Sequence, residues 1–227
     1  NQLGEDIDGE AMGDFSGYSV ALSSDGSRVV IGANYNDGNG TNSGHVRIYD
    51  WNGAAWVQVG GDIDGEAADD RSGYSVALSS DGSRVAIGAL NNDGNGASSP
   101  NSGHVRIYDF DGVHDDADGI DKWTQVGLDI DGEVSFDNSG FSVALSSDGS
   151  RVAIGAYGND GNGVSSGHVR VFEYGSSWTQ VGLDIDGEAA GDQSGFSVAL
   201  SSDGSRVAIG ARANDRNGVS SGPCQDL

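Results

Sequence analysis

The sequence is poor in several residues whose abundance would point to particular kinds of structure. Its 227 residues include one cysteine, Cys224, two prolines and one methionine. A single cysteine excludes an intrachain disulfide and a cysteine-based zinc site. Basic residues are also scarce: 11 Lys and Arg stand against 35 Asp and Glu, a net charge of −24. Because such a surface repels phosphate backbones and anionic headgroups, we expect no nucleic-acid partner and no membrane-surface partner.

Long hydrophobic runs are missing as well. No apolar stretch approaches the roughly 20 residues that a membrane helix needs, so we expect no membrane insertion. Glycine is abundant instead, with 39 residues, and Ser, Asp and Val are common. This composition is typical of short strands joined by polar turns.

The sequence is organised by an internal repeat. The string Ser-Gly-Tyr/Phe-Ser-Val-Ala-Leu-Ser-Ser-Asp-Gly-Ser-Arg-Val begins at Ser16, Ser72, Ser139 and Ser194, at spacings of 56, 67 and 55 residues. These starts divide the chain into units of approximately 16–71, 72–138, 139–193 and 194–227. We interpret 1–227 as one domain or part of one, with 1–15 supplying a closing strand and a loop between units.

Each unit contains four short runs rich in Val, Ile, Tyr and Trp and bounded by turn residues. In the first unit they cover 18–23, 28–33, 45–51 and 56–60. The Asp-Gly turn at Asp25 and Gly26 predicts a tight hairpin between the first two runs. One such meander cannot bury both of its faces, so the copies must stack. We therefore predict an all-β protein, a β-propeller of four-stranded antiparallel blades whose fourth repeat unit is incomplete.

The repeat resembles the FG-GAP repeat of integrin-α-like β-propellers. Ser-Gly-Tyr/Phe-Ser-Val-Ala stands where that family has its Phe-Gly strand, and Arg-Val-Ala-Ile-Gly-Ala, at 84–89 and 151–156, stands where it has Gly-Ala-Pro, although the Pro is absent from every copy. Many members bind calcium in the first hairpin. That site does not transfer to this chain, because Asp25, Asp81, Asp148 and Asp203 are each the sole carboxylate of their turn.

Acidic residues recur in the loop between units, which reads Asp-Ile-Asp-Gly-Glu-x-x-x-Asp-x-Ser-Gly. They are the candidate metal ligands: Asp6, Asp8, Glu10, Asp14, Asp62, Asp64, Glu66, Asp70, Asp129, Asp131, Glu133, Asp137, Asp184, Asp186, Glu188 and Asp192. The loop between the second and third strands adds Asp37, Asp93, Asp160 and Asp215. In a meander both kinds of loop lie at the same end. We therefore predict a binding face with 20 carboxylates.

Two interpretations of this acidic face stay open. The clustered oxygen ligands suit calcium, which we name as the candidate cofactor. Alternatively, Asp and Gly form turns in which carboxylates accept backbone N–H bonds. The repeated His45, His104 and His168 fall on separate sheets, too far apart to share one zinc ion, and are assigned a packing or hydrogen-bonding role. Repeated tryptophans such as Trp56, Trp123 and Trp178 are assigned to packing in the core or between blades.

No nucleophile constellation or phosphate loop is present in the sequence, and equal repetition is unlike a single active site. We therefore expect no enzyme. The expected function is an extracellular or cell-surface propeller that binds a protein or glycan, with a calcium requirement as an added expectation. One alternative is a structural building block of an extracellular assembly, joined through open blade edges as a homo-oligomer or as part of a larger propeller. A hydrolase with an acidic site is the weakest alternative.

Overall fold

Four repeated antiparallel sheets make up the computed structural model, which describes residues 2–94, 100–110, 112, 123–215 and 224–225. We call the sheets blades 1 to 4. Blade 1 contains β1 (Ser19–Leu22), β2 (Arg28–Ala33), β3 (His45–Trp51), β4 (Trp56–Gln58) and β5 (Ile63–Asp64). Blade 2 contains β6 (Ser72–Leu78), β7 (Arg84–Ala89), β8 (His104–Phe110), β9 (Trp123–Gln125) and β10 (Ile130–Asp131). Blade 3 contains β11 (Ser142–Leu145), β12 (Arg151–Ala156), β13 (His168–Tyr174), β14 (Trp178–Gln180) and β15 (Ile185–Asp186). Blade 4 contains β16 (Ser194–Leu200), β17 (Val207–Ala211) and β18 (Cys224–Gln225).

The predicted meander is confirmed in every blade. In blade 1 the strand order is β1-β2-β3-β4, all antiparallel, and β2 and β3 have the predicted bounds. Blade 1 also has a fifth short strand, β5, in the segment between units that the sequence predicted to be a loop. β5 pairs with β3 through Val46–Ile63 and His45–Asp64, and so holds the start of the acidic segment against the third strand. No helix long and apolar enough to span a membrane occurs in the described residues.

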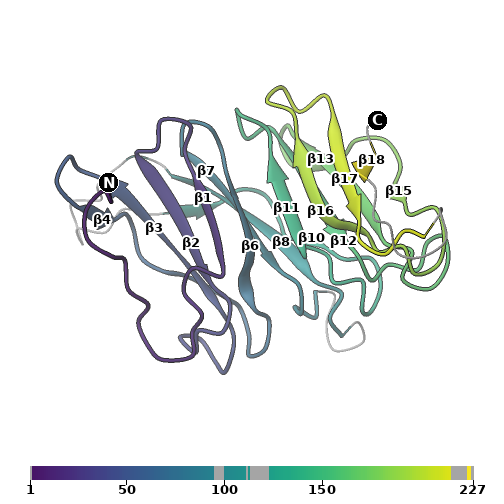
Figure 1. Ribbon diagram of the computed structural model, residues 1–227, viewed down its shortest axis with the longest axis horizontal. Helices are drawn as coiled ribbons and strands as arrows, with labels where there is room; N and C mark the ends of the chain where they lie inside the picture. The colour runs from purple at the N-terminus through teal and green to yellow at the C-terminus, as the bar shows by residue number, and fades with distance from the viewer. Residues whose placement is uncertain (1, 95–99, 111, 113–122, 216–223, 226–227) are drawn as a thin grey trace.

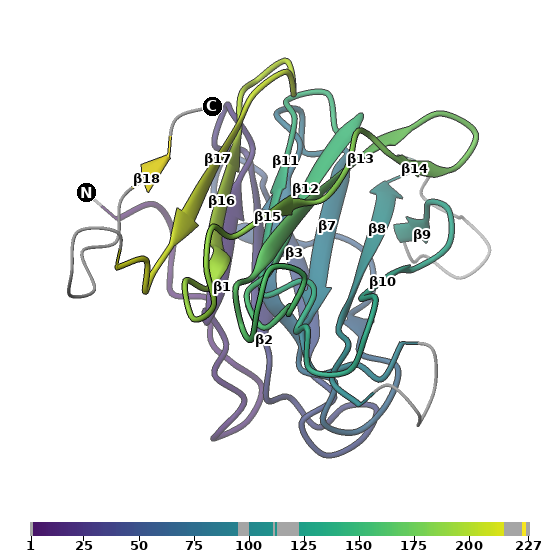
Figure 2. The same ribbon diagram turned by 90° about the vertical axis from the view of Figure 1, so that its right-hand side faces the viewer.

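The blades stack in chain order along an open arc. The first strands lie side by side, since β6 contacts both β1 and β11, and β11 contacts β16. Blades 1 and 4 lie at opposite ends of the molecule in Figure 1, and the view in Figure 2 looks along the stack from the blade 4 side. At one end, the hairpins are joined by backbone bonds from Ser24 N–H to the Ser80 carbonyl and from Ser80 N–H to the Ser147 carbonyl. In these hairpins the aspartate accepts bonds from neighbouring serines, as Asp25 does from Ser27, and we call Asp25, Asp81, Asp148 and Asp203 the hairpin aspartates.

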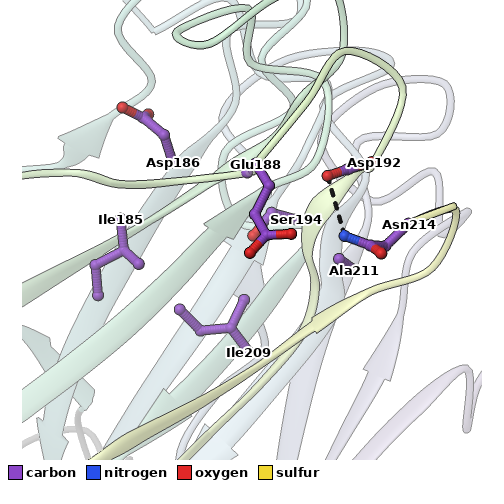
Figure 3. Close-up of a pocket in the computed structure, with 9 residues that line it drawn as sticks. Ile185, Asp186, Glu188, Asp192, Ser194, Ile209, Ala211 and Asn214 are labelled. Carbon is purple, nitrogen blue, oxygen red and sulfur yellow. Dashed lines mark hydrogen bonds between the residues drawn. The ribbon is translucent and has the colours of Figure 1, made fainter. Parts of the chain in front are cut away.

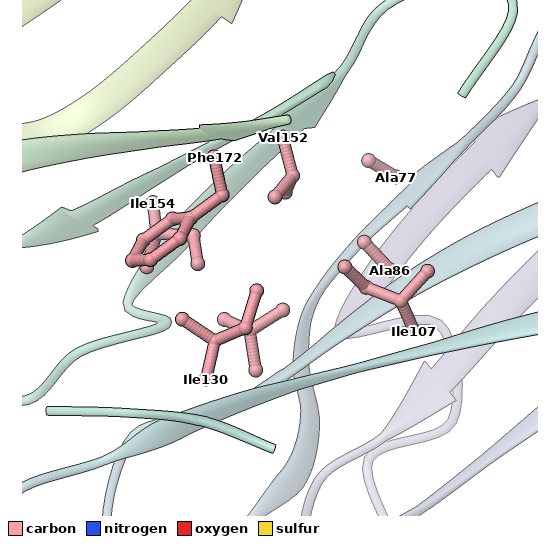
Figure 4. Packing of buried hydrophobic residues seen from close by; sticks show 8 residues of the cluster. Ala77, Ala86, Ile107, Ile130, Val152, Ile154 and Phe172 are labelled. Carbon is pink, nitrogen blue, oxygen red and sulfur yellow. The ribbon is translucent and has the colours of Figure 1, made fainter. Parts of the chain in front are cut away.

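The core lies between successive blades rather than within them. Between blades 2 and 3, one face contributes Ile107 and Ile130 and the other contributes Val152, Ile154 and Phe172 (Figure 4). Equivalent apolar clusters lie between blades 1 and 2 and between blades 3 and 4. In the first strand of blade 1, Ala21 packs against the cluster shared with blade 2, whereas Val20 and Leu22 are exposed. The predicted interblade role of the tryptophans is also confirmed, since Trp178 Nε1 donates to the Val126 carbonyl of the preceding blade.

Glycines set the spacing of the blades at one repeated point. A Cβ on Gly88 of blade 2 would overlap the carbonyl oxygen of Gly140 in blade 3, and Gly32 and Gly155 face Gly73 and Gly195 in the same way. The Gly140 oxygen also accepts a 2.7 Å hydrogen bond from Ser75 Oγ across the interface. This close approach of two backbones accounts for glycine in both repeated motifs.

The incomplete fourth unit and the start of the chain lie at different blades. Blade 4 has a short third strand, β18, which pairs with β17 through Gly210–Cys224 and Ile209–Gln225. The start of the chain, where a closing strand was expected, has no strand over residues 2–18 and contacts blade 1, where the Leu3 carbonyl accepts a 3.2 Å bond from Trp56 Nε1. Val59 and Val126 accept the equivalent bonds from Trp123 and Trp178 of the blades that follow them. The first residues therefore lie where the end of a preceding fourth strand would lie.

Candidate metal centre

Loops from neighbouring blades meet at the end of the molecule opposite the hairpins, at the bottom of Figure 1. The loop between β2 and β3 lies against the segment that leads into blade 2. Asp69 N–H donates to the Thr41 carbonyl, and Asn39 Nδ2 donates to the carbonyls of Gly65 and Glu66. The two kinds of acidic loop are therefore neighbours, and their carboxylates fall into four groups with different surroundings.

The last carboxylate of each segment is buried. Asp14, Asp70, Asp137 and Asp192 are between 1% and 6% exposed. Each accepts a bond from an asparagine Nδ2 located 22 residues later, supplied by Asn36, Asn92, Asn159 and Asn214 at 2.8 to 3.2 Å. Asp70 also accepts from Ala67 N–H at 2.9 Å. These four aspartates hold the loop in shape, as the turn interpretation expected, and the constant spacing to Asn is a signal that sequence reasoning missed.

The Glu of one segment and the first Asp of the next converge on the repeated histidine. In blade 1, His45 Nδ1 lies 3.7 Å from Glu10 Oε2 and 3.8 Å from Asp62 Oδ2. In blade 2, His104 Nδ1 lies 3.7 Å from Glu66 and 3.8 Å from Asp129. In blade 3, His168 Nδ1 lies 3.8 Å from Glu133, with Asp184 completing the group. We call these three groups the histidine clusters. In each, one nitrogen and two carboxylate oxygens lie within 4.8 Å of one another.

Second contacts fix the orientation of both carboxylates. Glu10 uses its other oxygen, Oε1, to face Arg47 Nη1 at 3.8 Å, and the same arginine donates through Nη2 to the Asp8 carbonyl. Asp62 uses Oδ1 to accept a 2.7 Å bond from Gln58, which leaves Oδ2 facing the histidine. Arg106 and Arg170, and Gln125 and Gln180, repeat these contacts in the next two blades.

The imidazoles are buried, whereas the carboxylates reach solvent. His45, His104 and His168 are each 1% exposed. Burial, reinforced by Arg106, lowers the pKa of His104 to about 4, so this ring is neutral at neutral pH. Burial likewise lowers the pKa of His168. Partial desolvation also raises the pKa of four loop carboxylates, namely Asp64, Glu66, Asp70 and Asp131.

The remaining predicted residues lie outside the clusters' donor sets. Asp64, Asp131 and Asp186, each the second Asp of a segment, belong to the short strands β5, β10 and β15. The carbonyl of Asp8 accepts from Arg47, and Asp6 accepts a 2.9 Å bond from Gln2. The binding-face aspartates are exposed, and in three of them the carboxylate accepts a backbone N–H within its own loop; those three are Asp37, Asp93 and Asp160. Asp215 is exposed and ends the described part of its loop.

Blade 4 lacks the histidine. The sequence has Pro223 after Gly222, where the other units have His after Gly. Glu188, the counterpart of Glu10, lines a cavity of about 30 Å³ between blades 3 and 4, next to the Asp192–Asn214 hydrogen bond (Figure 3).

The histidine clusters combine six of the predicted carboxylates with histidines that were considered only with one another. The histidines do lie on separate strands, β3, β8 and β13, and share no common site. Each instead meets carboxylates from the segments on either side of its own blade. The repeated Gly-His-Val-Arg motif, always between two acidic segments, was the signal available in the sequence.

Comparison with known proteins agrees with this architecture. The model of the FG-GAP repeat family matches residues 7–49 and 183–224. Two segments of the chain therefore match the FG-GAP repeat. No curated protein matches it significantly by sequence.

Two solved structures are similar to this chain in fold. The Cps50 (Swd1) β-propeller domain of Myceliophteria thermophila has a TM-score of 0.53 at 13% identity, covering 84% of this chain and 48% of that one. Hydrazine synthase of Kuenenia stuttgartiensis has a TM-score of 0.52 at 16% identity, covering 92% and 58%. The chain thus spans about half the length of the solved structures it matches, and at these identities the likeness concerns the β-propeller fold alone.

Proposed function

We propose that these FG-GAP repeats bind a protein or glycan ligand through the acidic loop end, outside the cell or at the cell surface, without catalysing a reaction. The observation that carries this proposal is the repeated cross-bracing of exposed acidic loops. Arg71 N–H donates to the Asn42 carbonyl and Ser72 N–H donates to the Ser43 carbonyl, so each loop is tied to the next blade. Rigid scaffolds that present polar loops commonly serve recognition. Equal repetition of the carboxylates favours a distributed surface over a single catalytic centre.

Calcium dependence is part of the same proposal and concerns the exposed carboxylates. Asp37 accepts the Asn42 backbone N–H at 2.8 Å, and Asn42 Nδ2 donates to Asp69 at 3.0 Å. Two carboxylates from adjacent loops therefore lie near one asparagine. Carboxylate and amide oxygens are the ligands that Ca²⁺ prefers. At this position the described donor set is all oxygen, unlike that of the histidine clusters.

Binding arrays test the recognition proposal. The chain is applied to glycan and extracellular-protein arrays in millimolar Ca²⁺ and in chelator, alongside a variant with Asp37→Asn, Asp93→Asn and Asp160→Asn. Asparagine keeps the oxygen that accepts the loop N–H, so these changes remove charge without opening the turns. We expect binding that the triple variant loses and that Asp25→Asn, at the hairpin end, retains. Absence of binding under both conditions, or equal binding by the triple variant, would contradict the proposal.

A building block of a larger assembly is the second candidate, favoured by an uncovered apolar sheet face. Tyr18, Val20 and Leu22 on β1 are 49%, 63% and 59% exposed. In blade 2 the equivalent Val76 and Leu78 pack against the core of blade 1. The sequence predicted association through open strand edges, whereas the exposed side chains on β1 favour association through the face of blade 1. Sedimentation of wild type and Leu22→Asp tests it, with the variant expected to be monomeric and the wild type to associate as concentration rises. A wild type that stays monomeric at high concentration excludes this candidate.

A further inference from the structure

A buried nitrogen without a partner lies inside two of the three histidine clusters. In the described structure, Nδ1 of His45 and Nδ1 of His104 are inaccessible to water and have no hydrogen-bond partner. The nearby carboxylate oxygens lie at 3.7 to 3.8 Å, too far for a hydrogen bond. An unpaired buried nitrogen is destabilising. The same arrangement occurs in blades 1 and 2, so both copies carry a polar atom directed at two carboxylates that it does not bond.

The donor set identifies the class of ligand that would satisfy this nitrogen. One imidazole nitrogen and two carboxylates are ligands of divalent transition metals such as Zn²⁺, whereas Ca²⁺ takes oxygen ligands. Tetrahedral Zn²⁺ places its ligand atoms about 3.3 Å apart, given bonds of about 2.0–2.1 Å. The observed separations of 3.7 to 3.8 Å approach that value, and both carboxylates belong to solvent-exposed side chains that can move inward.

Electrostatics and second contacts also suit a cation. Near His45, the carboxylates of Glu10, Asp62 and Asp64 carry three negative charges, and Arg47 carries one positive charge. Arg47 faces the Glu10 oxygen that points away from the histidine, so it positions the glutamate without occupying the site. The net charge of −24 adds a favourable long-range field for cations.

We propose that each of the three histidine clusters binds one divalent transition-metal ion of the Zn²⁺ class, through histidine Nδ1, the glutamate and the aspartate. Three protein ligands leave a fourth position toward solvent. Each ion would join the segment that enters a blade, the third strand of that blade and the segment that leaves it. Blade 4 supplies a natural control, since its sequence has Pro223 in the place of the histidine.

The test measures binding of Zn²⁺ alone to the full chain, without a polyhistidine tag, by calorimetry and by metal analysis after dialysis. We expect about three equivalents for the wild type and about two for His104→Gln. Glu66→Gln removes an exposed ligand of the same cluster, and it keeps the test decisive if the histidine variant does not fold. Glu188→Gln is the matched control in blade 4 and should retain three equivalents. Co²⁺ in place of Zn²⁺ should give visible absorption with nitrogen and oxygen coordination.

Three results would overturn the proposal. The first is the absence of Zn²⁺ binding by the folded wild type at micromolar metal. The second is an unchanged stoichiometry in both His104→Gln and Glu66→Gln. The third is an equal loss in Glu188→Gln, which would indicate diffuse attraction by negative charge. Failure of the ligand arrays leaves these outcomes unaffected, because Zn²⁺ is the only probe.

Discussion

Replacement of Gly88 by alanine tests how the blades are spaced. The built Cβ overlaps the Gly140 carbonyl oxygen of blade 3 and lies 3.0 Å from its carbon, with Ser75 on the other side. Both neighbours across the interface are backbone atoms, so neither can rotate away. The two sheets must therefore separate, and the apolar contacts between Ile107, Ile130 and blade 3 loosen with them.

The expected cost follows from two terms. Overpacking of a tight interior costs about 1–3 kcal/mol. Separation of the sheets also weakens the hydrogen bond from Ser75 Oγ to the Gly140 carbonyl, worth about 1 kcal/mol. We therefore expect Gly88→Ala to lower the free energy of unfolding by about 2–4 kcal/mol. For a chain of this length that corresponds to a fall in Tm of about 5–15 °C.

Thermal and urea unfolding followed by circular dichroism measure this change, and blade 4 offers a matched control. At Gly210 an added Cβ overlaps the Ser197 hydroxyl, as at Gly88 it overlaps that of Ser75, but its three nearest neighbours all belong to Ser197 of the same blade. A serine hydroxyl can change rotamer, so we expect Gly210→Ala to cost less than about 1 kcal/mol. Equal stabilities of the two variants would refute the argument that backbone approach between blades requires glycine.

Three further predictions concern the loops and the interfaces. Asp70→Ala leaves the Ala67 N–H and the Asn92 amide without their acceptor, so the free energy of unfolding should fall by about 2–4 kcal/mol. The control Asp69→Ala changes an exposed neighbour and should cost under about 1 kcal/mol. Equal effects of the two variants would contradict the role assigned to Asp70. Trp178→Phe keeps an aromatic ring but loses the 2.8 Å hydrogen bond to the Val126 carbonyl, so the free energy of unfolding should fall by about 1 kcal/mol or more. An unchanged Tm would show that this bond does not stabilise the fold. The thermal midpoint should fall as pH drops from 7 toward 4. His104, whose pKa burial lowers to about 4, and His168, whose pKa burial also lowers, stay neutral in the fold while the unfolded chain takes up their protons, so stability is lost as pH falls through the unfolded pKa of about 6.5. The raised pKa values of Asp64, Glu66, Asp70 and Asp131 offset part of this loss as these carboxylates protonate in the fold. Below about pH 4 the hairpin aspartates, whose pKa values are lowered, to about 2 in Asp25 and Asp148, also lose their contribution. A midpoint that rises from pH 7 to pH 5 would contradict this order.

Repetition made much of the fold predictable. Because the same strand and turn pattern occurs four times, the bounds of β2 and β3 and the antiparallel order could be read from one unit and checked in the others. The short strand β5 was missed because two residues, Ile63 and Asp64, give no periodic pattern, and only the nearby edge of β3 makes them a strand. The pairing of Cys224 with Gly210 was missed for the same reason.

The sequence by itself determined the blade, the turns and the end of the molecule at which negative charge collects, since these depend on local patterns of two to seven residues. Only the tertiary structure decided which carboxylates meet. Asp14 and Asn36 are 22 residues apart, and Glu10 and Asp62 come from different acidic segments on either side of one blade. Glu10 and Asp62 converge on His45 because the strands of blade 1 bring its two flanking loops to the same end of the sheet. No local pattern contains that information, because the distance between two loops is set by the sheet that separates them in the chain.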